Sequence, residues 1–168
     1  LRRLQEPSFL GRLLGGVRAR RDEVASRLGR RLPVLVKLAP DLDDDQLRTA
    51  VDVILASGLD GVIATNTTLS RAGVEGHPRA GEEGGLSGAA LSEASTRVIA
   101  RIHQHTGGTL PIVGVGGVMG PEDARAKLDA GAVLVQVYTG FIYEGPGLVR
   151  RLLRGMRRDG IDVACSQD

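Results

Sequence analysis

The chain has 168 residues, of which 42% are hydrophobic and 25% are charged, and its formal net charge is +2. These values are typical of a globular protein whose length suffices for one domain with a hydrophobic core. The single cysteine, Cys165, excludes an internal disulfide framework and a cysteine-based zinc site, and no apolar run reaches the roughly 18 to 20 residues of a membrane span.

The start of the chain is basic. Residues 1–31 contain nine arginines against three acidic residues. Such a segment can contact nucleic acid or anionic lipid, but few aromatic residues and no nucleic-acid motif accompany it. We therefore predict a solvated helix at about Leu13 to Arg27 and no nucleic-acid partner. Leu1 is not an initiator methionine and no signal-peptide pattern follows it, so we expect further residues upstream.

An apolar run followed by a helical pattern occurs four times along the chain. The helix after the first run has a predicted capping box at Asp43 and Gln46 and a C-cap at Gly58. The runs are short and rich in β-branched residues, as is typical of parallel strands buried on both faces. They span residues 33–39, 60–65, 110–115 and 132–137, and helices are expected at about 44–57, 92–105, from 121 onward, and at 148–158.

This alternation of strands and helices predicts an α/β fold with right-handed βαβ units and a parallel sheet. Two architectures contain such units, a doubly wound sheet and a (β/α)8 barrel. Because a complete barrel takes about 250 residues, four units preceded by a helix favour half of a barrel.

Polar residues at the ends of the first two predicted strands are candidates for binding. Lys37 lies in an otherwise apolar strand, where a charged amine is costly unless it meets an anion or reaches water along its alkyl stem. Thr65, Asn66, Thr67 and Thr68 follow the second strand, on the catalytic face of a barrel. These short side chains suit the amide and carboxylate groups of a small ligand, or they form a turn with Asn66 in a left-handed conformation.

Glycine-rich segments follow the second, third and fourth strands. The connection 70–89 is longer than the usual 2 to about 6 residues and is either a mobile lid or a solvated insertion. The loops after the last two strands of a barrel commonly bind phosphate through backbone N–H groups. Gly116 and Gly117 would let the backbone close on a phosphate, and Thr139 would add a hydroxyl.

The three histidines indicate no metal site. His103 and His105 cannot share one helix face at their spacing, and His77 lies in the long connection. No carboxylate pair or catalytic triad stands out, so we expect no metal.

Five motifs, in this order and spacing, resemble dihydroorotate dehydrogenase of class 2 over residues 1 to about 158. The motifs are Val36-Lys-Leu-Ala-Pro-Asp41, Thr65-Asn-Thr-Thr68, Gly84-Gly-Leu-Ser-Gly88, Pro111-Ile-Val-Gly-Val-Gly-Gly117 and Gln136-Val-Tyr-Thr139. The resemblance implies the C-terminal part of an FMN-binding barrel domain at residues 1–160, with a disordered tail at 161–168. It also implies oxidation of dihydroorotate to orotate in de novo pyrimidine biosynthesis, with a quinone as electron acceptor.

The resemblance assigns roles residue by residue. Lys37 would contact the flavin ring and stabilise negative charge on its reduced form. Thr65 would also touch FMN, and Asn66 and Thr67 would hold the pyrimidine substrate. The ribityl-phosphate site would be lined by Gly88, Gly117, Tyr138 and Thr139, together with Gly116 from the phosphate-loop argument.

The family's catalytic base is a serine in a loop that precedes the region matched by Leu1 to Gln5. The resemblance therefore implies no catalytic residue in this chain, no turnover by the chain alone, and a requirement for the N-terminal half of the barrel. Ser87 is not a substitute, because its motif belongs to the flavin side of the site. The complete enzyme would lie peripherally on the cytoplasmic side of the cell membrane, with this part soluble.

Two other interpretations remain open. Another phosphate- or FMN-binding barrel enzyme would explain the two glycine motifs, but not the residues 65–68 together with Lys37. A basic adaptor that uses residues 1–31 would bind polyanions in a salt-sensitive manner.

Overall fold

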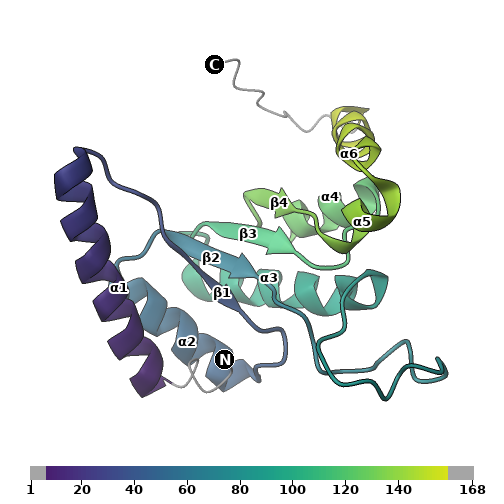
Figure 1. Cartoon of the computed structure of the whole chain (residues 1–168), viewed down its shortest axis with the longest axis horizontal. Helices are drawn as coiled ribbons and strands as arrows, with labels where there is room; N and C mark the ends of the chain where they lie inside the picture. Colours follow the sequence, from purple (N-terminus) through teal and green to yellow (C-terminus); the bar gives the residue numbers. More distant parts are fainter. Residues whose placement is uncertain (1–6, 159–168) are drawn as a thin grey trace.

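The computed structural model describes residues 7–158 (Figure 1), so the predicted tail at 161–168 lies outside the described residues. A long helix comes first, and strands then alternate with helices. The elements are α1 (Pro7–Leu28), β1 (Leu35–Leu38), α2 (Asp44–Ser57), β2 (Gly61–Ala64), the 3-10 helix η2 (Ala89–Leu91), α3 (Ser92–Thr106), β3 (Ile112–Val115), α4 (Pro121–Asp129), β4 (Leu134–Gln136), α5 (Thr139–Glu144) and α6 (Gly147–Arg158).

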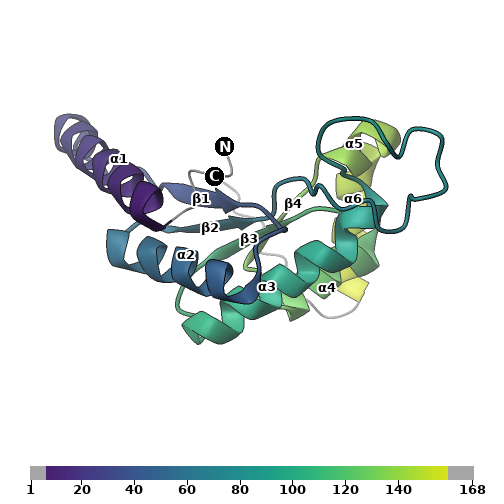
Figure 2. The ribbon, with the colours of Figure 1, turned by 90° about the horizontal axis from the view of Figure 1, so that it is seen from below.

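The four strands form one parallel sheet in the order β1-β2-β3-β4. Lys37, Ile63, Val113 and Leu134 stand in register across it. Helices α2, α3 and α4 lie along one face of the sheet, and α1 lies beside α2 (Figure 2). The predicted alternation of strands and helices, and with it the α/β class, is confirmed.

The side chains on the two faces of the sheet differ in burial. Val62, Ala64 and Ile112 point toward the helices and are fully buried in a large core beneath β1, β2 and β3. The four residues in register on the other face are more exposed to solvent, and Leu134 keeps 62% of its surface exposed. The prediction that the strands are buried on both faces is therefore wrong, because within residues 7–158 the helices cover one face only.

A second, smaller hydrophobic cluster lies at the β4 end of the sheet. It joins the segment after β3 to α4 and α6, and its buried members are Val118, Ala124, Leu148 and Leu152. The core of the described chain is therefore divided into two clusters.

Local sequence signals account for the helix ends. The capping box of α2 is present, since the Gln46 amide donates to Asp43 Oδ1 at 2.8 Å and the Asp43 amide to Gln46 Oε1 at 3.2 Å. Gly58 closes α2 with a φ of 65°. Helix α1 begins at Pro7 rather than at the predicted Leu13, because Leu10 and Leu14 on its first turns are buried in the large core.

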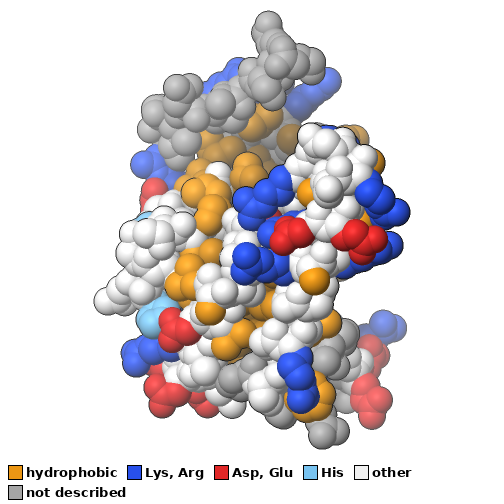
Figure 3. All heavy atoms as spheres, turned by 90° about the vertical axis from the view of Figure 1, so that its left-hand side faces the viewer, with side chains coloured by type: hydrophobic (Ala, Val, Ile, Leu, Met, Phe, Trp, Pro, Cys, Tyr) orange, Lys and Arg blue, Asp and Glu red, His pale blue; other side chains and the backbone are white. Residues whose placement is uncertain are grey.

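The arginines of α1 lie among acidic side chains (Figure 3). Arg18 pairs with Asp22 at 3.8 Å, and Arg21 pairs with Asp22 at 2.9 Å and with Asp60 at 3.3 Å. Asp60 also accepts the backbone N–H of Val34 at 2.7 Å, so this carboxylate connects α1 to the start of β1. No helix within residues 7–158 combines the length and the apolar character that crossing a bilayer requires.

Candidate functional site

A cavity of about 290 Å³ opens at the carboxyl ends of the four strands. Residues from the segments after β2, β3 and β4, together with the ends of β1, β3 and β4, form its wall. All nine residues selected from the sequence line this cavity: Lys37, Thr65, Asn66, Thr67, Gly88, Gly116, Gly117, Tyr138 and Thr139. Residues separated by as many as about a hundred positions therefore meet in one place.

In the segment after β2, residues 65–67, hydrogen bonds hold the backbone while two side chains are exposed. The amide of Thr65 donates to the carbonyl of Val115 at 2.8 Å, and the amide of Asn66 donates to the carbonyl of Leu38 at 2.7 Å. This segment is thereby tied to both neighbouring strands, while the side chains of Asn66 and Thr67 stay exposed. No described residue other than glycine has a positive φ, so the alternative of a left-handed Asn66 is wrong.

Lys37 projects from β1 on the sheet face that the helices leave uncovered. Its side chain is exposed and lines the cavity beside Thr65 and Gln136. The lysine avoids the cost of burial in an apolar strand because it emerges at this face. It brings a cationic group to the cavity wall.

The loop at Gly116 and Gly117, the glycine loop, packs against the first turn of α3. Gly117 has a φ of 72°, and a Cβ built on it would lie 2.4 Å from both the backbone nitrogen and the Cα of Ser92. A Cβ on Gly116 would lie 3.0 Å from Leu91 Cδ2 and 3.1 Å from Ser95 Cβ. Only glycine allows this approach, which leaves the loop backbone at the cavity wall without side chains.

The end of the long connection after β2 contacts the start of α5 at the cavity. Thr139 Oγ1 donates to Ser87 Oγ at 3.0 Å, and a Cβ on Gly88 would lie 3.4 Å from Thr139 Cγ2. The loop after β2 and the start of α5 are thus in direct contact.

Six further residues line the cavity that the sequence interpretation did not select. Gln136 carries the clearest sequence signal, because it is a polar residue in an otherwise apolar strand, two positions from Leu134 and hence on the same sheet face. Gly140 is explained only by packing, since a Cβ there would lie 2.3 Å from the Val118 carbonyl oxygen. The six are Ser87, Leu91, Val115, Val118, Gln136 and Gly140.

The long connection between β2 and α3 is held together by one arginine. The guanidinium of Arg71 donates to the carbonyls of Ala80 at 2.9 Å, Glu82 at 2.8 Å and Gly84 at 2.9 Å. Thr68 and Leu86 close its base with two backbone hydrogen bonds of 3.1 and 2.7 Å. Most residues of this connection are exposed, as the solvated insertion predicts, and the loop is folded around its own cation.

Replacement of Arg71 by alanine is expected to loosen this loop. The variant removes the donors for four carbonyls at once, because Arg71 also donates to the Leu69 carbonyl at 3.3 Å. Thermolysin should therefore cut within residues 69–86 roughly tenfold faster than in the unmodified chain. Arg79→Ala is the matched control, because Arg79 lies in the same loop, is 77% exposed and pairs with Glu82 at 3.6 Å. Equal cleavage of the two variants would contradict the role given to Arg71.

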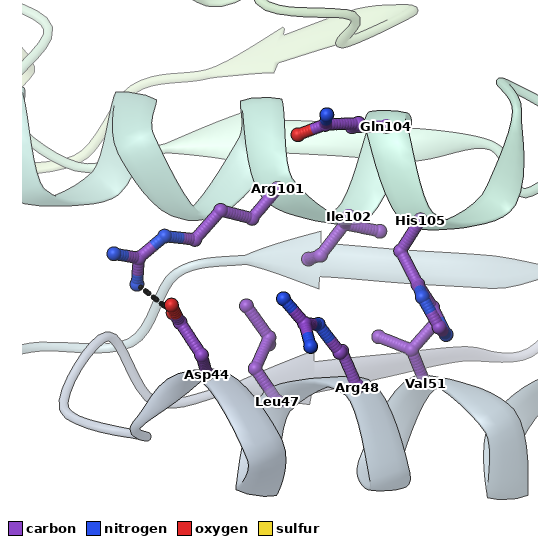
Figure 4. Close-up of a pocket in the computed structure, with 8 residues that line it drawn as sticks. All are labelled: Asp44, Leu47, Arg48, Val51, Arg101, Ile102, Gln104 and His105. Atoms are coloured by element: carbon purple, nitrogen blue, oxygen red, sulfur yellow. Dashed lines mark ion pairs between the residues drawn. The ribbon is translucent and has the colours of Figure 1, made fainter.

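A second hollow, of about 400 Å³, lies between α2 and α3 (Figure 4). Arg101 pairs with Asp44 across it at 2.8 Å. His105, at its edge, contacts Asp52 at 2.7 Å. None of the nine selected residues lines this hollow, so it is separate from the cavity at the strand ends.

Comparison with known proteins identifies the family. The family profile described as dihydroorotate dehydrogenase matches residues 1–159. A dihydroorotate dehydrogenase (quinone) from Thiobacillus denitrificans is 53% identical over 150 residues, which are 89% of this chain and 44% of that protein. One from Anaeromyxobacter dehalogenans is 56% identical over 158 residues, 94% of this chain and 42% of that protein. The chain thus spans less than half the length of these relatives.

A solved structure gives the same result for the fold. The crystal structure of DHODH from Eimeria tenella in complex with ferulenol is 33% identical, with a TM-score of 0.87, and the match covers 95% of this chain and 47% of that one. The four βα units correspond to about half of that barrel, which confirms the predicted half-barrel. The chain belongs to the dihydroorotate dehydrogenase family.

Proposed function

We propose that this chain forms the FMN- and pyrimidine-binding part of an enzyme that oxidises dihydroorotate to orotate with a quinone as electron acceptor. One observation carries the proposal: a single cavity collects all nine residues that the sequence indicates for flavin and substrate. Family membership, through relatives named dihydroorotate dehydrogenase (quinone), supports the reaction.

The cavity wall fits a phosphorylated flavin. Gly116 and Gly117 present bare backbone toward it, and a Cβ at Gly117 would collide with Ser92. Backbone N–H groups of such a loop suit a phosphate, and Thr139 adds a hydroxyl. Lys37 and Thr65, across the sheet, would lie beside the ring. FMN, when bound, supplies an acceptor for the hydride that leaves the substrate.

The substrate would be held by the exposed side chains of Asn66 and Thr67. An amide and a hydroxyl together offer donors and acceptors for the ring amides and the carboxylate of dihydroorotate. Because the Asn66 backbone is bound to Leu38, and the Thr67 amide donates to Asn66 Oδ1 at 3.0 Å, the pair has a defined orientation. A fixed orientation of substrate against acceptor is a large part of what a protein contributes to such a reaction.

We also propose that the proton is removed by a group outside these 168 residues. The family resemblance implies a serine base, and among the described residues that line the cavity Ser87 is the single serine. Its Oγ accepts a hydrogen bond from Thr139, so Ser87 lies with the residues proposed for the phosphate and not with the substrate-binding pair. The base, the quinone site and the attachment to the cytoplasmic face of the membrane would then come from the rest of the barrel protein. The chain by itself would form no orotate.

The test compares the 168-residue chain with a completed barrel. In the completed barrel, the chain is joined to the part of the Thiobacillus denitrificans relative that lies outside the matched region. After FMN addition and gel filtration, we expect the completed barrel to keep the visible flavin spectrum and to form orotate with a soluble quinone, and the chain alone to form none.

The matched variant is Asn66→Ala in the completed barrel. It should retain FMN but form orotate roughly 100-fold more slowly, because it loses a substrate contact and no cofactor contact. A colourless completed barrel would refute the proposed function. Orotate formation by the 168-residue chain alone would instead refute the external base.

A further inference from the structure

Lys127, on α4, is a buried lysine, and its side chain has 0% of its surface exposed. Its Nζ donates to Ser95 Oγ and Thr96 Oγ1, both at 3.2 Å, and to the carbonyl of Ser92 at 3.4 Å. All three acceptors belong to the first turns of α3. The lysine therefore connects α4 to the start of α3.

The same turns of α3 support the glycine loop. A Cβ built on Gly117 would lie 2.4 Å from Ser92 Cα, and a Cβ built on Gly116 would lie 3.1 Å from Ser95 Cβ. Ser95 Oγ donates to the carbonyl of Val115, the residue before the loop, at 2.6 Å. The glycine loop thus has the cavity on one side and the hydrogen-bond partners of the lysine on the other.

The fold does not depend on this ammonium group to satisfy its neighbours. Ser95 donates to Val115, and Thr96 Oγ1 donates to the Ser92 carbonyl at 2.9 Å, so both hydroxyls have partners without Lys127. An apolar side chain of similar volume would leave these bonds intact, and such replacements of buried charges are often neutral or stabilising.

The charge is retained at a cost to stability. Burial lowers the pKa of Lys127 from 10.5 to about 8, and nearby Asp123 opposes part of that decrease. Because the folded pKa lies below the unfolded one, the unfolded chain binds more protons between these values. Stability therefore rises as the pH increases from about 8 to 10.5, and below pH 8 the protonated lysine disfavours folding. Costly charges of this kind concentrate at functional sites.

The hydrogen-bond partners of Lys127 are uncharged, and among the described residues the one charged group that acts on its pKa is Asp123. On α3 and β3 the facing groups are hydroxyls and carbonyls. Asp123, on α4 itself, accepts the N–H groups of residues 119 and 120 at 2.9 and 3.0 Å. Charged side chains on the adjacent elements form pairs with one another, Glu93 with Arg97 on α3 and Arg151 of α6 with Glu144 of α5.

We propose that Lys127 is a positioning residue for the phosphate group of the flavin. Its ammonium, hydrogen-bonded to the first turns of α3 behind the glycine loop, supplies positive potential to that loop. Loss of the charge would also leave the negative charge of Asp123 less compensated, and this too would weaken binding of the phosphate. The inference rests on the proposed function, and it concerns the phosphate alone, so riboflavin serves as the neutral probe.

The test uses Lys127→Met, in the 168-residue chain and in the completed barrel, with FMN and riboflavin as ligands. We expect FMN affinity to fall roughly tenfold or more, because a desolvated unit charge near an anion contributes an effect of this order. Riboflavin affinity should not change, and the melting temperature at pH 7 should not decrease. Arg125→Met removes the same charge from a half-buried position of α4 that pairs with Asp129, and it should change neither affinity.

A pH profile gives a second measurement, for which Lys127→Met is the control. The ratio of FMN to riboflavin affinity should fall up to roughly tenfold between about pH 7 and pH 9.5 as Lys127 loses its proton, since the phosphate, with a second pKa of about 6, stays doubly charged. In Lys127→Met the ratio should be flat.

Two results would overturn the inference. One is an equal loss of FMN and riboflavin affinity with a lower melting temperature, which assigns Lys127 a purely structural role. The other is an unchanged FMN-to-riboflavin ratio in the variant and across the pH range. If neither the unmodified 168-residue chain nor the unmodified completed barrel binds FMN or riboflavin, the proposed function itself is refuted, and the inference with it.

Discussion

Gly117→Ala is expected to weaken FMN binding by at least roughly 100-fold. The added Cβ would lie 2.4 Å from backbone atoms of Ser92, and a φ of 72° is strained for any residue with a side chain. A change of side-chain rotamer cannot relieve this clash, because the new Cβ would meet the backbone of Ser92. The loop must therefore move, and its N–H groups leave the geometry that suits a phosphate. Flavin retention through gel filtration and a fluorescence titration measure the loss.

Gly120→Ala is the matched control within the same segment. Gly120 has an extended backbone with a φ of −154°, and no atom lies within 4 Å of a Cβ built there. This variant should bind FMN like the unmodified protein. Equal binding by Gly117→Ala and the unmodified protein would show that the glycine loop does not carry the phosphate site.

Lys37→Met is expected to make the reduction potential of the bound flavin more negative by roughly 30 to 60 mV, or about 1.4 to 3 kcal/mol for a two-electron couple. Lys37 lines the cavity from β1, and a cation beside the ring favours the form that carries more negative charge. Its loss therefore destabilises the reduced flavin relative to the oxidised one. Spectroscopic titration against a dye of known potential measures the shift.

The conservative variant separates charge from packing. Lys37→Arg keeps the cation on the same uncovered sheet face and should retain most of the potential. A potential that is unchanged in Lys37→Met would place the lysine away from the ring and remove it from the proposed flavin contacts.

The sequence predicts the elements well because their signals are local. The apolar β-branched runs identify all four strands, and Asp43, Gln46 and Gly58 define the ends of α2. The position of the site also follows from local information, because parallel strands bring their carboxyl ends to one edge. Each of the nine selected residues lies at or after the end of a strand, or at the end of the long connection, and all of them meet in the cavity.

What the sequence does not predict depends on packing between distant segments. Lys127 lies in a polar helical stretch that reads as solvent-exposed, and only the approach of α3 buries it. Helix α5 is too short to show a helical period. The exposure of one sheet face is also hard to predict, because apart from Lys37 and Gln136 the residues on that face are as apolar as those in a covered strand, with Leu134 as the clearest example.

The division of the core into two clusters has a consequence for cooperativity. The large cluster supports β1 to β3, whereas the small one, with four buried residues, supports α4 and α6. The cavity crosses the boundary, since Thr65 follows β2 and Val118 belongs to the small cluster. Without a ligand in the cavity, we expect the small cluster, which has fewer buried residues, to open at the lower free energy. A ligand that contacts both clusters at once is expected to make the two melt in a single step.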